Sequence, residues 1–428
     1  MSDSDSDVVQ ELFASDSWQR KLIRSDTNKA IECWQNVFYV LQNHPAWKNV
    51  LAFDSFAQMP VKRKDAPTGA CAGPWSAEDD TLLGLWLAQQ MKLTIKSLGN
   101  ISTGALACAQ ANPFHPVTAW LDSLVWDETE RLPFWMSDCL GVKRSPYAMA
   151  VGTYFIMNLV ARVYEPGCIM RSVPVLEGAQ ERGKSTALRM LVGDAWFSDS
   201  HFDVSGKDSF ELIQGVWLYE ISEMESFNKA ESGRVKQFVS SIKDSWVPKY
   251  IRGRVTARRQ VCFAGTVNEF IYQKDWTGTT RFWPLRCEAE GNIDLDLINT
   301  QREQLFAEAV VRVRRGDRRF PTAEEYRDLF LDEQEARVVH HPWREPIFAW
   351  LDLTTREKVT AYEILSEVIK VETAKMTLLN QQDVGRIMQA AGWERKRESD
   401  GLRKWYYAAP EKPKQEHRNG SDIEADPF

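Results

Sequence analysis

Large apolar residues recur every three or four positions in the first part of the chain. His44-Pro45 is expected to end the first set, and Ser76 is a suitable N-cap for the second. The pattern predicts a helical domain over residues 18–112, after a Ser/Asp-rich tail, 1–17, that lacks the apolar content to fold. The two sets each mark one helical face: Ile31, Trp34, Phe38 and Leu41, and Leu83, Trp86, Leu87 and Met91.

Beyond the first domain, the apolar residues no longer recur at helical spacing but form short continuous runs. One begins at Val173, and three others cover residues 215–220, 260–267 and 282–285. Such runs are typical of strands buried on both faces of a parallel sheet. Because helical patterns accompany them, we predict an α/β domain over residues 113–300, with a helical N-terminal part.

The next segment returns to a helical pattern. One amphipathic helix is predicted from Thr300 to Gly316, in a helical connector that spans residues 301–342. Its last turn carries three arginines that complement the helix dipole without any ligand: Arg312, Arg314 and Arg315.

Residues 343–409 are expected to form a third, smaller domain. Thr360 and Glu363 have the spacing of a capping box at the start of one helix, and Asp383 can cap another. Two strand-like runs around Asp400-Gly401 predict a hairpin. Helices followed by a basic hairpin indicate a winged-helix-like domain, which either binds duplex DNA or makes only protein contacts.

Composition narrows the class of protein. With 428 residues and 43% hydrophobic content, the chain can form several domains, and its net charge of −7 confines any nucleic-acid binding to local patches. Seven scattered cysteines without a Cys-x-x-Cys pair indicate reduced thiols rather than disulfides or a zinc site. The acidic N-terminus is unlike a signal peptide, and no apolar run is long enough to span a membrane. We therefore expect a soluble cytoplasmic protein.

The strongest chemical signal follows the first strand-like run. Gly178 and Gly183 frame the pattern Gly-x-x-x-x-Gly-Lys-Ser, which ends at Lys184 and Ser185 and opens a helical pattern. This is the sequence of a phosphate-binding loop: its backbone N–H groups cradle phosphates, the lysine reaches the β- and γ-phosphates, and the serine hydroxyl binds Mg²⁺. Thr186 is a further candidate ligand. The alternative is a Gly-rich turn that binds nothing.

Polar residues at the ends of the next two runs supply candidates for hydrolysis. Glu220 ends the second run and Glu223 follows three residues later. One carboxylate can hold the Mg²⁺ shell, with Glu220 the candidate metal ligand beside Ser185, and the other can polarise the attacking water. Asn268 ends the third run, where an amide can contact the γ-phosphate or position the water. The alternatives are a solvated acidic helix start for the two acids and a strand-ending turn for Asn268.

A basic segment separates these two strand ends. Lys249, Tyr250, Arg252 and Arg254 belong to a stretch of eleven residues that holds five cations and no acid. A glycine inside a β-prone run makes a hairpin plausible, and Tyr250 and Trp246 offer rings on which bases can stack. We expect this loop to bind single-stranded DNA; the alternative is a surface hairpin with incidental charge.

The order of these parts resembles the AAA+ ATPases of superfamily 3 helicase type and, more closely, the virulence-associated protein E family of phage and prophage replication proteins. The resemblance spans residues 113–290. The matching motifs are Phe114-His115-Pro116-Val117, Leu124-Val125-Trp126-Asp127, Pro166-Gly167-Cys168, Leu176-Glu177-Gly178 with Gly183-Lys184-Ser185-Thr186, Lys207-Asp208, Trp217-Leu218-Tyr219-Glu220 with Glu223, Gly265-Thr266-Val267-Asn268, and Asp275-Trp276-Thr277-Gly278 before Arg281-Phe282-Trp283-Pro284.

The resemblance implies a ring-forming, Mg²⁺- and ATP-dependent motor with an AAA+ core, expected to be a hexamer in the cytoplasm of a bacterial host. Such motors are often encoded beside or fused to a primase, and the N-terminal residues show no primase palm signature, so any primase is expected to be a separate chain. Three positions depart from the family: Glu181 stands where glycine is usual, a single Arg281 replaces a pair of arginines, and the two acids Glu220 and Glu223 are not adjacent.

We therefore predict a DNA helicase or translocase for the replication of a phage or mobile element. Arg281, at the edge of the sheet, is expected to reach the nucleotide of a neighbouring subunit; the alternatives are a phosphate contact in its own subunit and an ion pair with Asp275. Two other functions stay open. One is an AAA+ switch or helicase loader that does not unwind, and the other is a winged-helix initiator in which the nucleotide is structural.

The C-terminal segment 410–428 is acidic and ends in Pro427-Phe428. It is similar to the acidic Pro-Phe terminus of bacterial single-strand-binding proteins, which a basic pocket recognises. The segment is expected either to recruit a host replication protein or simply to keep the chain soluble.

Overall fold

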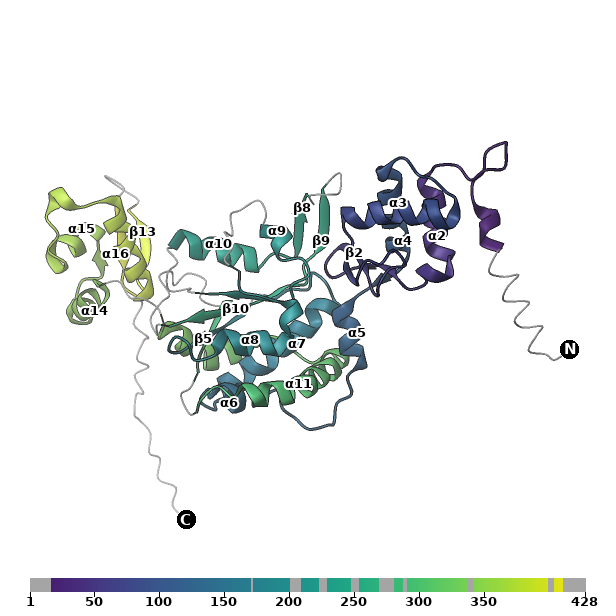
Figure 1. Ribbon diagram of the computed structural model, residues 1–428. Helices are drawn as coiled ribbons and strands as arrows, with labels where there is room; N and C mark the ends of the chain where they lie inside the picture. Colours follow the sequence, from purple (N-terminus) through teal and green to yellow (C-terminus); the bar gives the residue numbers. More distant parts are fainter. Residues whose placement is uncertain are drawn as a thin grey trace, which may run out of the picture. The chain divides into compact units, whose positions relative to one another are not determined.

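The computed structural model describes residues 17–170, 172–200, 209–222, 229–247, 254–268, 281–287, 291–337, 342–398 and 404–410. The chain forms two compact units, Met1–Val338 and Val339–Phe428 (Figure 1). Within the described residues, no helix is both long enough and apolar enough to cross a lipid bilayer.

The N-terminal part of the first unit contains both helices and a sheet. The sequence pattern predicts only helices here, and that prediction is incomplete. The two predicted helices are present, and the hydroxyl of Ser76 caps the second as expected. The four-stranded sheet has the order β3-β2-β1-β4, and its strands of two or four residues are too short to show a clear alternation in the sequence. The elements are η1 (Ser17–Lys21), α2 (Trp34–Asn43), η2 (Pro45–Trp47), β1 (Leu51–Asp54), β2 (Met59–Lys62), β3 (Gly73–Pro74), α3 (Ala77–Met91), α4 (Leu98–Ala111) and β4 (Pro113–Phe114).

The central part of the first unit is built on a five-stranded sheet, so the predicted α/β class is confirmed. The strands are β5 (Val173–Glu177), β6 (Phe197–Ser198), β7 (Leu218–Ile221), β10 (Cys262–Val267) and β11 (Phe282–Arg286). Their order is β11-β5-β10-β7-β6, and every neighbouring pair is parallel. If the five strands are numbered 1 to 5 in the order in which they occur along the chain, their order across the sheet is 5-1-4-3-2. The first strand therefore lies between the fourth and the fifth.

Helices cover both faces of this sheet (Figure 1). On one face, Leu176 and Trp283 pack against α7, α8 and α11. On the other face, Val175 and Phe263 pack against α10. The strands bury both faces, which explains their continuous apolar runs. The helices and the hairpin strands of this part are α5 (Pro116–Ser123), α6 (Trp135–Leu140), α7 (Pro146–Tyr164), α8 (Lys184–Val192), η3 (Asp194–Trp196), α9 (Ser209–Leu212), α10 (Lys229–Val239), β8 (Lys243–Trp246), β9 (Val255–Arg258), α11 (Leu295–Arg315), α12 (Ala323–Glu325), η6 (Tyr326–Phe330) and α13 (Leu331–Glu335).

The second unit has helices and a three-stranded antiparallel sheet of order β12-β14-β13. The capping box of Thr360 and Glu363 is present. The predicted cap at Asp383 is wrong, because α16 begins earlier and a reciprocal pair of Thr377 and Asn380 caps it. Asp383 lies inside that helix and pairs with Arg386. The elements are α14 (Arg344–Leu353), β12 (Lys358–Val359), α15 (Ala361–Glu363), η7 (Ile364–Val368), η8 (Thr373–Lys375), α16 (Leu378–Ala390), β13 (Glu394–Arg397) and β14 (Trp405–Ala408).

Candidate nucleotide-binding site

The loop between β5 and α8 has the backbone conformation of a phosphate cradle. Gly183, the N-cap of α8, has a φ of 89°, and Gly178 has a φ of 155°, both in a region that side chains disfavour. A Cβ built on Gly183 would meet the side chain of Leu295 at 3.9 Å, an ordinary contact distance, so it is the backbone conformation rather than lack of space that favours glycine here. The loop leads into the N-terminus of α8, where free backbone N–H groups and the helix dipole favour an anion.

Lys184 lies across the mouth of this loop. Its Nζ donates hydrogen bonds to the carbonyl oxygens of Gly178 and Ala179, at 2.6 and 2.7 Å. It also lies 3.3 Å from Oδ1 of Asn268, which directly follows β10. Because β10 is the neighbour of β5, the sheet brings the predicted lysine and asparagine together.

Ser185, Glu220 and Thr266 form a second polar group beside Lys184. The hydroxyls of Ser185 and Thr266 both donate to Oε1 of Glu220, at 2.7 and 2.6 Å. Glu220 is 2% exposed, and its other oxygen, Oε2, is buried and has no hydrogen-bond partner. A buried carboxylate oxygen without a donor is costly to leave unpaired.

The donor set fits a hard divalent cation with phosphate ligands. Carboxylate and hydroxyl oxygens are the ligands that Mg²⁺ prefers, and the partnerless Oε2 of Glu220 is available to such an ion or to its water. Thr266 was not among the residues predicted from the sequence. The feature of the sequence that could have identified Thr266 is that it is a hydroxyl residue in the otherwise apolar run of β10.

The remaining loop residues are placed differently. Thr186 is exposed on the first turn of α8, and Glu223 lies outside the described residues. Glu181 points to solvent and has a φ of 61°, in the left-handed region. The departure from glycine at this position therefore places a strained backbone, rather than a buried acid, in the loop.

Arg281 precedes the edge strand β11 as predicted. Its Nε donates to Oγ of Ser240 at 2.8 Å, just after α10. The suggested ion-pair partner Asp275 lies outside the described residues.

The predicted basic hairpin has a described base. Strands β8 and β9 pair in an antiparallel manner, and Nε of Arg259 donates to both carboxylate oxygens of Asp244, at 2.9 and 3.0 Å. Arg254 is exposed at the start of β9. Trp246 is only 7% exposed, so the expectation that it stacks on bases is wrong; its position on β8 turns it into the protein. The residues Lys249, Tyr250 and Arg252 lie outside the described residues.

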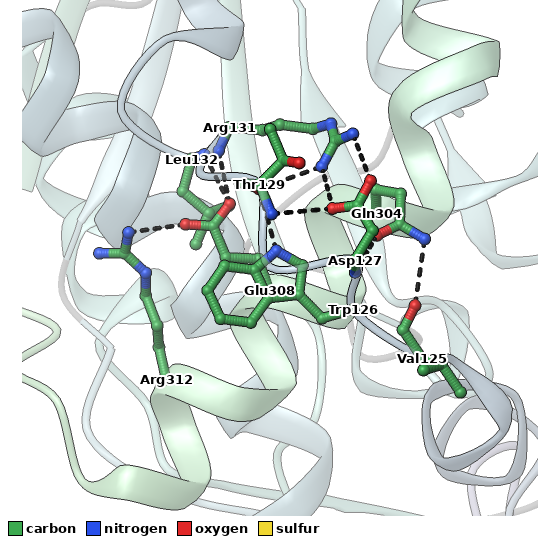
Figure 2. A network of polar contacts seen from close by, with 9 residues as sticks. All are labelled: Val125, Trp126, Asp127, Thr129, Arg131, Leu132, Gln304, Glu308 and Arg312. Carbon is green, nitrogen blue, oxygen red and sulfur yellow. Dashed lines mark hydrogen bonds and ion pairs between the residues drawn. The ribbon is translucent and has the colours of Figure 1, made fainter.

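The Leu-Val-Trp-Asp motif has a structural role. Figure 2 shows that it fastens the loop after α5 to α11. The backbone N–H of Asp127 donates to Gln304 at 2.9 Å, and Arg131 donates to both Asp127 oxygens at 2.7 Å. The bonds from Arg131, together with one from the backbone N–H of Thr129, hold the pKa of the Asp127 carboxyl well below its usual range. The buried Glu308 accepts from the backbone N–H of Arg131 at 2.7 Å, so α11 is fixed against the loop.

Comparison with known proteins gives one family and a set of similar structures. A family model described as "Virulence-associated protein E-like domain" matches residues 121–339. The chain is similar to the C-terminal region of NrS-1 in its apo structure, at 12% identity and a TM-score of 0.49, over 86% of this chain and 97% of that one. An A form of the same region matches at 12% identity and a TM-score of 0.47, over 88% of this chain and 99% of that one. No curated protein matches.

Proposed function

Because the chain belongs to the virulence-associated protein E-like family, we propose that it is a Mg²⁺-dependent ATPase with an AAA+ core, acting as a superfamily 3-type DNA helicase or translocase. One observation carries this proposal. The hydroxyl of Ser185 bonds to the buried Glu220, whose second oxygen has no hydrogen-bond partner, at the edge of the sheet where the parallel strands β5 and β7 end on either side of β10. Ligands of open α/β sheets bind at this edge.

The described residues suggest a division of roles. Ser185 and Glu220 would hold Mg²⁺, which neutralises charge on the phosphates when bound. Lys184 would exchange its two carbonyl contacts for phosphate oxygens, and Asn268 would orient the attacking water. Either Glu220 or Glu223 acts as the base. Gly178, Gly183 and Thr186 complete the loop that surrounds the phosphates.

The proposed DNA path uses the β8–β9 hairpin. Lys249, Tyr250, Arg252 and Arg254 would contact single-stranded DNA, and the buried pair of Arg259 and Asp244 supports the hairpin at its base. Replacing Lys249, Arg252 and Arg254 with Ala should reduce the salt dependence of single-strand binding by about 0.7 log unit for each phosphate that the variant no longer neutralises. An unchanged salt slope would contradict this path.

We place this motor in a homo-oligomeric ring, a hexamer, in the cytoplasm of a bacterial host, where it supports the replication of a phage or mobile element. A separate primase and host replication proteins are its expected partners. The α-β-α-α-β-β order of the second unit supports a winged-helix assignment for that unit.

The decisive experiment measures ATP hydrolysis and strand displacement by the purified protein, with and without single-stranded DNA. A helicase requires ATP for displacement and hydrolyses it faster when single strands are present, and Lys184→Ala should lose both activities. DNA-independent hydrolysis without displacement would indicate a switch or loader. Duplex binding without hydrolysis would indicate an initiator, and either result would overturn the helicase assignment.

A further inference from the structure

An open groove of about 1160 Å³ lies in the second unit, between α16 and the β13–β14 strands. Leu378 and Gln382 line it from the helix, and Arg395 and Lys404 line it from the strands. The groove lies outside the candidate nucleotide site, and none of its described residues has a role in the proposed ATPase.

The helix side of the groove is polar and carries a repeated side-chain type. Gln381, Gln382 and Gln389 are exposed on α16, and Arg386 lies among them. The carboxylate of Asp383 accepts a bond from Nη1 of Arg386 at 3.1 Å, which fixes the guanidinium on the helix surface. Glutamine and arginine are the side chains that recognise adenine and guanine edges through paired hydrogen bonds.

The strand side supplies positive charge. The lining cations outnumber the acids, with Glu394 the one lining carboxylate among the described residues. Cations in this position complement the phosphates on either side of a DNA groove. The cations on the strand side are Arg395, Lys396 and Lys404, and Arg386 adds a fourth from α16.

The contacts of Trp405 favour duplex over single-stranded DNA as the occupant of the groove. Its ring is half-exposed, but the guanidinium carbons of Arg395 and Arg397 lie 4.4 and 5.5 Å from the ring centroid. A base could stack on this ring only by displacing an arginine from a cation–π contact. A helix with exposed glutamines, by contrast, fits the width of a major groove without rearrangement.

We propose that the second unit reads the sequence of duplex DNA, with α16 in the major groove and the cations of the strands on the backbone. Gln382, Arg386 and Gln389 would contact base edges, and the exposed Leu378 would contact thymine methyl groups near the start of the helix. This is a second DNA site, and it does not depend on nucleotide hydrolysis.

The test uses the full chain without nucleotide and in the presence of a chelator. Random-sequence duplexes are selected for binding, and affinity is then measured by fluorescence anisotropy for the selected duplex, a shuffled duplex and the single strand. The variants are Q382A/R386A/Q389A for the helix and R395A/K404A for the strands. K375A, at a side chain that is 72% exposed and outside the groove, is the control. Circular dichroism verifies that each variant is folded.

The helix variant should lower the preference for the selected over the shuffled duplex by roughly 10- to 100-fold, while single-strand binding stays unchanged. The strand variant should weaken both duplexes alike and reduce the salt slope by about 0.9 for each phosphate that is no longer neutralised. K375A should change neither quantity. Selection that enriches no sequence, a helix variant that keeps its preference, or a loss confined to single strands would overturn the proposal. Because no ATP is present, failure of the proposed motor activity would leave these results unaffected.

Discussion

Arg337 and Glu177 form a bidentate ion pair inside the first unit. Nε and Nη2 of Arg337 each lie 2.9 Å from one oxygen of Glu177, and the two side chains are 6% and 2% exposed. Burial by itself lowers the pKa of Arg337, but hydrogen bonds and charge from Glu177 and Glu333 outweigh this and raise it above its usual range. Glu177 ends β5 and directly precedes Gly178, so the pair fixes the strand end from which the phosphate loop departs.

Breaking this pair should therefore destabilise the protein strongly. Arg337→Met removes the bidentate guanidinium from a buried carboxylate, and breaking a buried ion pair in this way typically costs about 3–5 kcal/mol of unfolding free energy. The double variant E177M/R337M should recover part of that loss, because no charge stays buried. Urea unfolding measures both. Glu165→Gln is the control, since Glu165 is 61% exposed and lies 3.3 Å from Arg319, and it should cost less than about 1 kcal/mol. Equal losses for R337M and E165Q would contradict the role of the pair.

Glu220→Gln should separate nucleotide binding from metal use. The amide can still accept the hydroxyl bonds of Ser185 and Thr266, but it removes the negative charge that favours Mg²⁺. We expect a fluorescent ATP analogue to bind in the presence of chelator as it does to the parent protein. Mg²⁺ should no longer tighten this binding, and turnover should fall by about 100-fold or more. Thr266→Val is the matched control because it removes one hydroxyl bond without changing the charge. Normal Mg²⁺ dependence in E220Q would exclude Glu220 as the metal ligand.

Glu181→Gly should stabilise the protein and tighten nucleotide binding. Glycine adopts the left-handed backbone of this position without the strain of a side chain, a difference of about 1 kcal/mol. The substitution also removes an acid from a loop expected to hold phosphates. Glu128→Gly is a close control, since Glu128 is an exposed glutamate with a φ of 65° far along the chain from the loop. Both variants should melt at higher temperature, but only E181G should change ATP affinity, measured by calorimetry.

Arg281 is predicted to act on the nucleotide of a neighbouring subunit. Arg281→Ala should bind ATP but lose about 10³- to 10⁵-fold in turnover, as for an arginine finger. Lys184→Ala subunits are expected to be inactive because their own phosphate loop is defective, although their Arg281 is intact. Mixing the two variants should therefore restore activity at interfaces where the intact loop of one subunit meets the intact arginine of the next. Ser240→Ala is a control that removes only the hydroxyl to which Arg281 donates. Mixed rings that show no turnover at any ratio would place Arg281 in its own subunit or outside catalysis.

Gly385→Ala should destabilise the second unit although alanine is the better helix former. A Cβ at Gly385 would lie 2.7 Å from the hydroxyl oxygen of Tyr407, a residue of β14 that packs in the same core as α16. The clash should outweigh the gain of about 1 kcal/mol in helix propensity. Tyr407→Phe removes the hydroxyl, so G385A should cost less in the Y407F background. Thermal unfolding of the parent protein, G385A, Y407F and the double variant tests the contact. Additive effects of the two substitutions would show that the contact does not influence stability.

The sequence predicted much of the local structure because local chemistry dominates there. The capping box at Thr360 and the N-cap at Ser76 need only residues three positions apart. The phosphate-loop motif is also recognisable from the sequence, since Gly183 and Lys184 belong to one short segment between one strand and one helix. The cap of α16 was misplaced at Asp383 because Thr377 is an equally suitable cap residue, and tertiary packing selects between them.

The residue pattern alone identifies the chemical groups: a phosphate-loop motif, acids and an amide at strand ends, and a basic segment. Which of these groups meet depends on how the whole chain folds. The order of the strands sets β10 between β5 and β7, and this brings Asn268 to Lys184 and Thr266 to Glu220. The pair of Arg337 and Glu177 joins residues 160 positions apart. Contacts of this range depend on how sheets and helices pack, and no local pattern of residues records them.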